Sequence, residues 1–447
     1  MLKTLKNVFR VKEMRQKLFY VVCMIFVIRL GSQLPVPGVD SSFFKEWFEN
    51  NSSDAFNFFN AFTGGSFEQM SIFALNITPY ITSSIIIQLL TIAIPKLEEM
   101  QRDGEEGRKK LTAITRYVTV GLAVFQSTAM AIGFGRQGLI PALISSSTNA
   151  FQKLCVGFVV VACLTAGSAM LMWIGERITE KGIGNGISIV LTVNIVSRIP
   201  SDFGNLYENF VKGKTVAKGT LAALIIIAII LAVVVLVLVL NGAERRIPVQ
   251  YSRKMVGRKL MGGQSSNIPL KVNTAGVIPV IFASSIMSFP VIIAQFAGKS
   301  GATGFFGDLL HGLQSSNWCN PNQLQYSWGL ILYCALVIFF AYFYTSITFN
   351  PMEVADNIKK QGGFIPGIRP GKPTQEYLTN ILNYIIFIGA VGLLIVAVIP
   401  FFFNGIFHAN VSFGGTSIII IVGVVLETIK QVESQMLVRN YKGFLNK

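Results

Sequence analysis

Residues 58–96 read FFNAFTGGSFEQMSIFALNITPYITSSIIIQLLTIAIPK, and this stretch decides the fold. It is apolar enough for a membrane span, but a Gly-Gly pair at 64–65 and the polar run Asn-Ile-Thr-Pro at 76–79 interrupt it. Irregular backbone at membrane depth is tolerated where it is buried in protein or lines a water-filled cavity. We therefore expect a small half-helix over 61–72, then a full helix facing a pore, with the rest of the chain around both.

The composition is that of a membrane protein. The chain has 447 residues, of which 52% are hydrophobic and 13% are charged, whereas soluble domains carry about 25% charged residues. This excludes a soluble globular enzyme. The five cysteines are scattered without the spacing of a disulfide framework or a metal site, so we expect no metal and no cofactor.

Ten apolar runs have about the length of 20 residues that a membrane-spanning helix needs. They are Leu18–Leu34, Phe58–Ile94, Tyr117–Phe134, Phe151–Ile174, Ile183–Ile199, Thr220–Leu240, Ala275–Phe296, Trp328–Phe349, Leu378–Phe403 and Phe413–Met436. The predicted fold class is therefore an all-α polytopic membrane protein with ten transmembrane helices.

The distribution of basic residues gives the orientation. With the N-terminus in the cytosol, the inside segments hold 29 of the 38 Lys and Arg residues, the outside segments hold 8, and Arg29 lies within the first span. Cytoplasmic loops carry such an excess, so both termini are expected in the cytosol. Ten spans then divide into halves of five with inverted topology, residues 1–200 and 201–447. Inverted halves typically place a site at their interface near the midplane of the membrane.

Two cytosolic loops are long and basic. The loop 243–271 is rich in β-forming residues and predicts a protruding hairpin, and the loop 350–376 carries Arg369 in a tip rich in glycine and proline. Basic protrusions suit an acidic protein surface or the phosphate backbone of RNA. The alternative is that these charges do no more than obey the orientation rule for membrane proteins.

No catalytic set is present in the sequence. It contains neither HExxH nor GxSxG, and the stretch PGIRPGKP at 366–373 fails as a phosphate-binding loop because Pro366 stands at the first glycine position and Pro373 follows the lysine. We expect the chain not to be an enzyme, so that the energy for any transport comes from a partner.

Eight motifs, in this order and on this topology, resemble the SecY family, the central subunit of the protein-conducting channel of bacterial type. They are LPVPG at 34–38, FTGG at 62–65, TPYI at 78–81, GEEGRKK at 104–110, WIGERITEKGIGNGIS at 173–188, AGVIP at 275–279, PGIRPG at 366–371 and FGGTS at 413–417. The resemblance implies two inverted five-helix halves around a central pore. It also implies a channel that passes unfolded secretory proteins across the membrane and releases apolar segments sideways into lipid.

The resemblance also implies roles for single residues. The pore ring falls on Ile77, Ile81, Ile187, Leu191, Ile281 and Ile420. The plug, within 57–75, includes Phe62, Thr63, Gly64, Gly65 and Ser66. The lateral gate includes Thr82, Gln126, Asn273 and Phe289. Docking of the ATPase SecA or the ribosome falls on Arg369, Arg245, Arg246, Arg253, Lys254, Arg258 and Lys259.

Each of these roles has a plainer alternative. An isoleucine in a span usually contacts lipid or the protein core, the plug segment could be a re-entrant packing segment, and Gln126 and Asn273 could be ordinary polar contacts between helices. Asn194 is expected to form a hydrogen bond between helices.

The implied partners are SecE and SecG in a heterotrimer, the ATPase SecA, the ribosome, signal peptides and nascent chains, with YidC and SecD/SecF as further candidates in the plasma (inner) membrane. A secondary transporter of a small solute would also suit ten spans and a broken helix. The pore lining distinguishes the two, because a small-solute site needs converging polar groups, whereas the candidates here are aliphatic.

Overall fold

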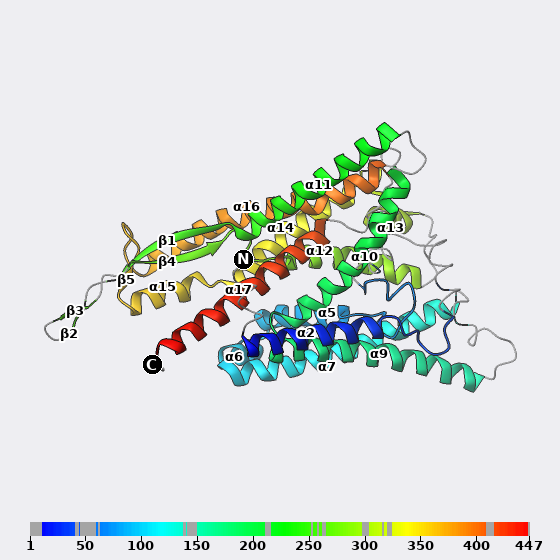
Figure 1. Ribbon diagram of the computed structural model, residues 1–447, viewed down its shortest axis with the longest axis horizontal. Coiled ribbons are helices and arrows are strands. Elements are labelled where there is room, and N and C mark those ends of the chain that lie inside the picture. Colours follow the sequence, from blue (N-terminus) through cyan, green and yellow to red (C-terminus); the bar gives the residue numbers. More distant parts are fainter. Residues whose placement is uncertain are drawn as a thin grey trace. The chain divides into compact units, whose positions relative to one another are not determined.

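The computed structural model describes residues 11–40, 44, 60, 63–136, 140, 150–210, 216–251, 254–256, 259–261, 265–296, 304–314, 317–319, 324–407 and 415–445 (Figure 1). Each of the ten predicted spans overlaps one of its long helices. These are α2 (Lys12–Gly31), α5 (Thr78–Ala93), α7 (Gly104–Arg136), α9 (Ala150–Lys181), α10 (Gly186–Phe210), α11 (Val216–Gly242), α12 (Ile278–Phe296), α14 (Trp328–Thr348), α16 (Lys372–Phe407) and α17 (Gly415–Leu445).

Length and apolarity alone select fewer helices than ten. Within the described ranges, five helices meet such a criterion for crossing a membrane. A sixth is added when α5 and the short helix α6 (Pro95–Arg102), which meet at a bend of 108°, are counted together. Charged residues inside or at the ends of helices such as α2 and α17 lower their mean hydropathy below that of an uninterrupted apolar run.

Contacts between residues divide the chain into two compact units. The first unit is Met1–Phe203 with Pro290–Gly307 and Val424–Lys447, and the second is Gly204–Phe289 with Asp308–Gly423. One boundary falls inside α12 at Pro290, where a proline removes a backbone hydrogen bond from the helix. Three further boundaries fall inside α10 after Phe203, inside α13 (Phe305–Leu313) after Gly307 and inside α17 after Gly423.

In the first unit, α7 packs against both α5 and α9, while α2 contacts α9 and α6 contacts α7. Small hydroxyl side chains join these helices: Ser83 on α5 bonds to Thr119 on α7, and Ser127 on α7 lies 3.1 Å from Thr165 on α9. Such residues let helices approach closely where lipid provides no hydrophobic driving force for their association.

The half-helix expected over 61–72 is a wrong prediction. The described residues from Gly64 to Ile77 form consecutive turns and one bridge residue, and the next regular helix, α5, begins at Thr78. We call residues 63–77 the turn segment. Its backbone has positive φ at Gly64 (66°), Gly65 (86°), Met70 (43°) and Asn76 (52°), and a right-handed helix cannot pass through such residues.

In the second unit, α14 and α11 both pack against α16, and a buried core joins α11, α12, α14, α16 and the start of α17. Trp318, Tyr333 and Phe401 pack their rings together in this core, with ring centroids between 4.9 and 5.5 Å apart. Trp318 Nε1 donates to the Gly312 carbonyl at 2.8 Å, which satisfies the polar atom of a buried indole.

The hairpin predicted over 243–271 is confirmed. It consists of β1 (Glu244–Tyr251) and β4 (Ser265–Lys271), paired antiparallel from Glu244↔Lys271 to Gln250↔Ser265. The short strands β2 (Lys254–Val256) and β3 (Lys259–Met261) pair with each other farther along the hairpin (Figure 1).

The two long basic loops are one structure, which their sequences do not indicate. After the helix α15 (Pro351–Lys360), the two-residue strand β5 (Gly363–Phe364) pairs with β1 and makes a sheet of order β4-β1-β5. One buried cluster contains residues of both loops and of α16: Ile247, Val249, Leu270, Ala355, Ile358, Ile365, Leu378 and Ile385. We call this assembly of β1, β4, β5 and α15 the loop platform.

The shared cluster predicts that damage to one loop loosens the other. Ile365 is 3% exposed, so Ile365→Ala removes a buried side chain at a cost of about 2–5 kcal/mol. We expect backbone hydrogen exchange in β1 and β4 to accelerate at least tenfold. The neighbouring Phe364→Ala, at a position 38% exposed, is the control and should change exchange little. Acceleration confined to residues 350–376 would contradict the shared platform.

Candidate functional site

One side of the turn segment is apolar and packs on α7 and α9. Phe67, Met70 and Leu75 are each at most 2% exposed and belong to a core that includes Phe134 of α7 and Leu164 of α9. The rings of Phe67 and Phe134 have centroids 6.0 Å apart. This contact is non-directional, because apolar side chains gain from leaving water whatever their exact partner.

The backbone of the turn segment is bonded to the chain that follows α2. Ser71 forms a bridge with Pro35, the Val36 N–H donates to the Met70 carbonyl at 3.0 Å, and the Ile72 N–H donates to the Leu34 carbonyl at 2.9 Å. These bonds replace part of the hydrogen bonding that a helix would have supplied to a buried backbone.

Helix α9 contacts the end of the turn segment at backbone distance. A Cβ at Gly167 would lie 2.0 Å from the Ile72 carbonyl oxygen, so a larger residue does not fit there. The adjacent Ser168 donates its hydroxyl to the Asn76 carbonyl at 3.1 Å.

The contacts of the turn segment with α10 are polar. Asn194 Nδ2 donates to Asn76 Oδ1 at 3.0 Å, which confirms the expected hydrogen bond of Asn194. Arg198, one turn farther along α10, lies 3.7 Å from Glu68 Oε2, measured from Nη1. Ser197 Oγ lies 3.5 Å from the Gly64 carbonyl.

Sequence reasoning missed the pair of Glu68 and Arg198. Glu68 stands in an otherwise apolar stretch, and a charge in such a stretch indicates a partner nearby. The sequence carries no signal for which of the basic residues that partner is, since the two lie 130 positions apart.

The residues assigned to the pore ring fall in both units. In the first unit, the Ile81 N–H donates to the Ile77 carbonyl at 3.0 Å, so these residues are one helical turn apart at the start of α5. Ile187 and Leu191 are likewise one turn apart on α10. Ile77 and Leu191 are buried, while Ile81 and Ile187 are partly exposed.

The other two ring residues belong to the second unit. Ile281 lies in the first turn of α12 and is partly exposed, and Ile420 on α17 is 2% exposed.

Four of the five residues assigned to the plug are described, and Phe62 lies outside the described residues. Thr63 is fully buried, and its hydroxyl accepts from the Phe67 N–H at 3.3 Å. Gly64 and Gly65 follow with positive φ, and Ser66 is 2% exposed. These residues form the first turns of the turn segment.

The residues assigned to the lateral gate make different contacts. Thr82 donates its hydroxyl to the Thr78 carbonyl within α5 at 3.0 Å. Gln126 Oε1 on α7 is buried and makes no hydrogen bond within the described part of the chain. Asn273 donates to Asn241 Oδ1 at the end of α11 at 2.7 Å. Phe289 lies on α12, and its side chain is outside the described residues.

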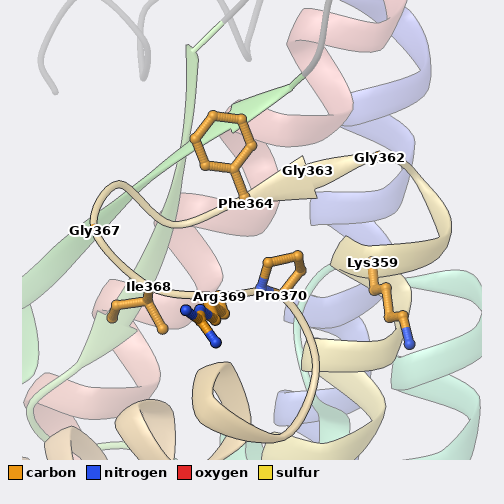
Figure 2. A pocket seen from close by; sticks show the side chains of 8 residues that line it. All are labelled: Lys359, Gly362, Gly363, Phe364, Gly367, Ile368, Arg369 and Pro370. Atoms are coloured by element: carbon orange, nitrogen blue, oxygen red, sulfur yellow. The ribbon is translucent and has the colours of Figure 1, made fainter.

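Arg369 lies at an open pocket of about 490 Å³ on the loop platform. Figure 2 shows the loop that leaves β5 at Phe364, turns at Gly367 and returns through Arg369 and Pro370. Lys359 of α15 lies across the view from Gly367. Gly367 has φ 83°, which favours glycine. The hydroxyl of the buried Thr374 donates to the Arg369 carbonyl at 2.8 Å, so the arginine projects from a fixed backbone.

The other residues assigned to docking lie on the hairpin. Arg245 and Arg246 are exposed at the start of β1, and Arg246 is paired with Glu244 at 2.6 Å. Lys254 and Lys259 lie on β2 and β3, where the structure describes the strands and not the side chains. Arg253 and Arg258 lie outside the described residues.

Sequence comparison relates the chain to protein translocase subunits over its whole length. A sequence model of the SecY family matches residues 71–429. The protein translocase subunit SecY of Streptomyces galbus is 44% identical over 457 residues, covering 100% of both chains. The corresponding subunit of Mycobacterium bovis is 41% identical over 455 residues, again covering 100% of both.

Comparison with solved structures gives the same fold at low sequence identity. A protein-conducting channel superimposes with a TM-score of 0.62 at 16% identity, over 94% of this chain and 92% of that one. Sec61 in the canine ribosome-channel complex from the endoplasmic reticulum superimposes with a TM-score of 0.57 at 15% identity, over the same shares. A SecY protein whose plug domain is described as stabilising the closed state and maintaining a membrane seal gives 0.59 at 16% identity, over 94% and 92%.

The fold is therefore that of an all-α polytopic membrane protein with ten transmembrane helices. With a family match across most of the chain and relatives above 40% identity over their full length, this protein belongs to the SecY family.

Proposed function

We propose that this chain is the subunit of a protein-conducting channel through which unfolded secretory proteins cross the membrane and from which apolar segments enter lipid. The full-length similarity to protein translocase subunits carries this conclusion. The alternative of a small-solute transporter receives no support from these relatives. The chain carries no catalytic motif that we recognise, and we propose that a partner supplies the energy.

We propose that Ile77, Ile81, Ile187, Leu191, Ile281 and Ile420 form the pore ring. A narrow aliphatic constriction excludes water and blocks ions, while its side chains can still repack around a passing polypeptide. The spacing of one helical turn within each of the pairs 77/81 and 187/191 supports the proposal, because it puts both members of a pair on one helix face.

Residues 57–75, which include most of the turn segment, are proposed as the plug that closes this pore. Its positive-φ glycines and its lack of regular helical bonding suit an element that has to leave its site. The lateral gate is proposed at Thr82, Gln126, Asn273 and Phe289. The buried amide oxygen of Gln126 has no hydrogen-bond partner among the described residues, which suits a seam that opens, since interhelical polar contacts in membranes contribute only about 0.6–2 kcal/mol each.

The loop platform is proposed as the docking site for the ATPase SecA and the ribosome. Sec61 in the canine complex is a ribosome-bound channel. The positive charge of the platform and of the loop segments that extend from it supports docking through Arg369, Arg245, Arg246, Arg253, Lys254, Arg258 and Lys259. Arg369 stands at an open pocket, where its guanidinium can make the bidentate contacts that a lysine cannot.

We further propose SecE and SecG as partners in a heterotrimer, with signal peptides and nascent chains as substrates and YidC and SecD/SecF as further contacts. The protein is a multi-pass membrane protein, and we place it in the plasma (inner) membrane with both termini in the cytosol. The excess of basic residues in the inside segments supports this orientation. We also propose that residues 1–200 and 201–447 are the inverted halves.

Site-specific crosslinking tests the pore. In a variant without the five native cysteines, Ile281→Cys should form a disulfide with a cysteine in the middle of a stalled secretory chain, in membranes that contain the partner subunits and the ATPase. Val235→Cys, on α11 at a position 57% exposed, is the control and should not react. A chain that is demonstrably engaged yet reacts at Val235 and not at Ile281 would overturn the pore assignment.

Substitution of Arg369 tests docking. Arg369→Glu should lower ATPase-driven translocation more than tenfold, because hydrogen bonds to charged groups contribute about 1.5–3 kcal/mol. Arg369→Lys should also lower it, since the planar fork is lost. Lys372→Glu makes the same change of charge at an exposed position three residues away and should have a smaller effect. Equal effects of the two charge reversals would indicate a general electrostatic contribution instead.

A further inference from the structure

The polar contacts between the turn segment and α10 hold the segment at two separate points. Glu68 faces Arg198 at 3.7 Å near the middle of the segment, and Asn76 bonds to Asn194 at its end. Asn194 and Arg198 are one turn apart, so both points of attachment lie on one face of α10.

These contacts are shielded from water. Asn76 and Asn194 are 1% and 3% exposed, and the side chains of Glu68 and Arg198 are 22% and 18% exposed. Arg198 Nε and Nη1 are buried and make no hydrogen bond within the described residues, so Glu68 is the acidic group that compensates this charge there. Removing one partner of a shielded ion pair is unfavourable, because the other charge is left uncompensated.

The two partners of the ion pair are not equivalent. Glu68 also forms two hydrogen bonds with Asn60, which precedes the turn segment: its Oε2 accepts from Asn60 Nδ2 at 2.8 Å and its N–H donates to Asn60 Oδ1 at 3.2 Å. The described contacts of the Arg198 guanidinium contain no comparable second partner. Loss of the negative charge at 68 is therefore more unfavourable than loss of the positive charge at 198.

Polar contacts of this kind respond to a displacement of the segment differently from the apolar contacts on its other side. The apolar core on α7 tolerates small displacements, whereas the hydrogen bond between Asn76 and Asn194 requires distance and angle and is replaced by water once the groups separate. The attraction between Glu68 and Arg198 weakens as water enters between the two charges. The contacts with α10 thus resist the first displacement of the segment and contribute little after it.

We propose that Glu68 within the plug and Asn76 just after it form, with Asn194 and Arg198 of α10, a polar clasp that sets the threshold at which the plug leaves α10. This inference rests on the proposed plug role of the turn segment. The clasp holds the idle channel closed against ions, and a secretory chain opens it by separating the two points of attachment.

Charge exchange tests the ion pair. In planar bilayers containing the purified channel complex without a substrate, Glu68→Gln should raise the ion leak about fivefold to thirtyfold, as expected for a loss of one or two kcal/mol. Arg198→Gln should raise it less. Glu68→Arg and Arg198→Glu should each leak, and the double variant should return toward the parent. The clasp would be overturned if the ion leak of the double variant were the sum of the leaks of the two single variants. It would also be overturned if the single variants leaked no more than the parent.

Two neighbouring glycines give a matched pair for the contact itself. A Cβ at Gly64 would lie 2.8 Å from the Asn194 carbonyl oxygen, whereas a Cβ at Gly65 meets no atom within 4 Å. Both glycines have positive φ, so both alanine variants carry backbone strain. We expect Gly64→Ala to leak more than Gly65→Ala, because only the first pushes the segment away from α10. Equal leaks would contradict a clasp at this contact.

Labelling separates failure of the clasp from failure of the plug. In the cysteine-free background, Gln69→Cys should react faster with a membrane-impermeant thiol reagent when a secretory chain is stalled in the channel than when the channel is idle. Unchanged labelling would mean that the segment stays in place, and the plug role would fall. Faster labelling together with no effect of the charge variants on the leak would leave the plug intact and remove the clasp.

Discussion

Backbone N–H and C=O groups that leave a helix inside a membrane protein must find partners in the protein, because hydrocarbon offers none. The turn segment, residues 63–77, meets this requirement without regular helix. Its backbone bonds to Leu34 and Val36 beyond α2, its end is held by Ser168 of α9, and its apolar side chains fill a core shared with α7. Helices α2, α7, α9 and α10 are thus arranged around a segment that needs all of them.

The same requirement supports the proposed displacement of the segment. A helix keeps its internal backbone hydrogen bonds when it moves. The turn segment instead depends on neighbouring segments for hydrogen bonds, and it would exchange those bonds for bonds to water if it left its site. An element of this kind has its site and its release conditions set by the surrounding side chains. The residues of α10 that contact it, Asn194, Ser197 and Arg198, are all polar.

The sequence was sufficient to predict the ten helices, because long apolar runs and the distribution of basic residues depend on local composition. The hairpin 243–271 was also predictable from its β-forming residues. The half-helix over 61–72 was not correct, since the positive φ of Met70 could not be predicted from a methionine. The union of the two loops could not be predicted either, because β5 has two residues and its pairing with β1 depends on the folded chain. A hydrogen bond of Asn194 to another helix could be predicted from the sequence. The pairing of Arg198 with Glu68 could not be predicted, because it too depends on the folded chain.

The loop platform joins directly to the helices below it. Strand β1 follows α11 after the single residue Ala243, whose carbonyl accepts from the Val272 N–H at 2.9 Å where β4 ends. From Val272, a short stretch leads to α12 at Ile278, and the Val272 carbonyl approaches α16 so closely that a Cβ at Gly389 would lie 2.3 Å from it. The hairpin is therefore joined to the helices at its base by short connections and close contacts. If a partner docks on the hairpin as proposed, a mechanical load at its tip would be shared by α11, α12 and α16, and the hairpin would act as a stiff lever rather than as a tether.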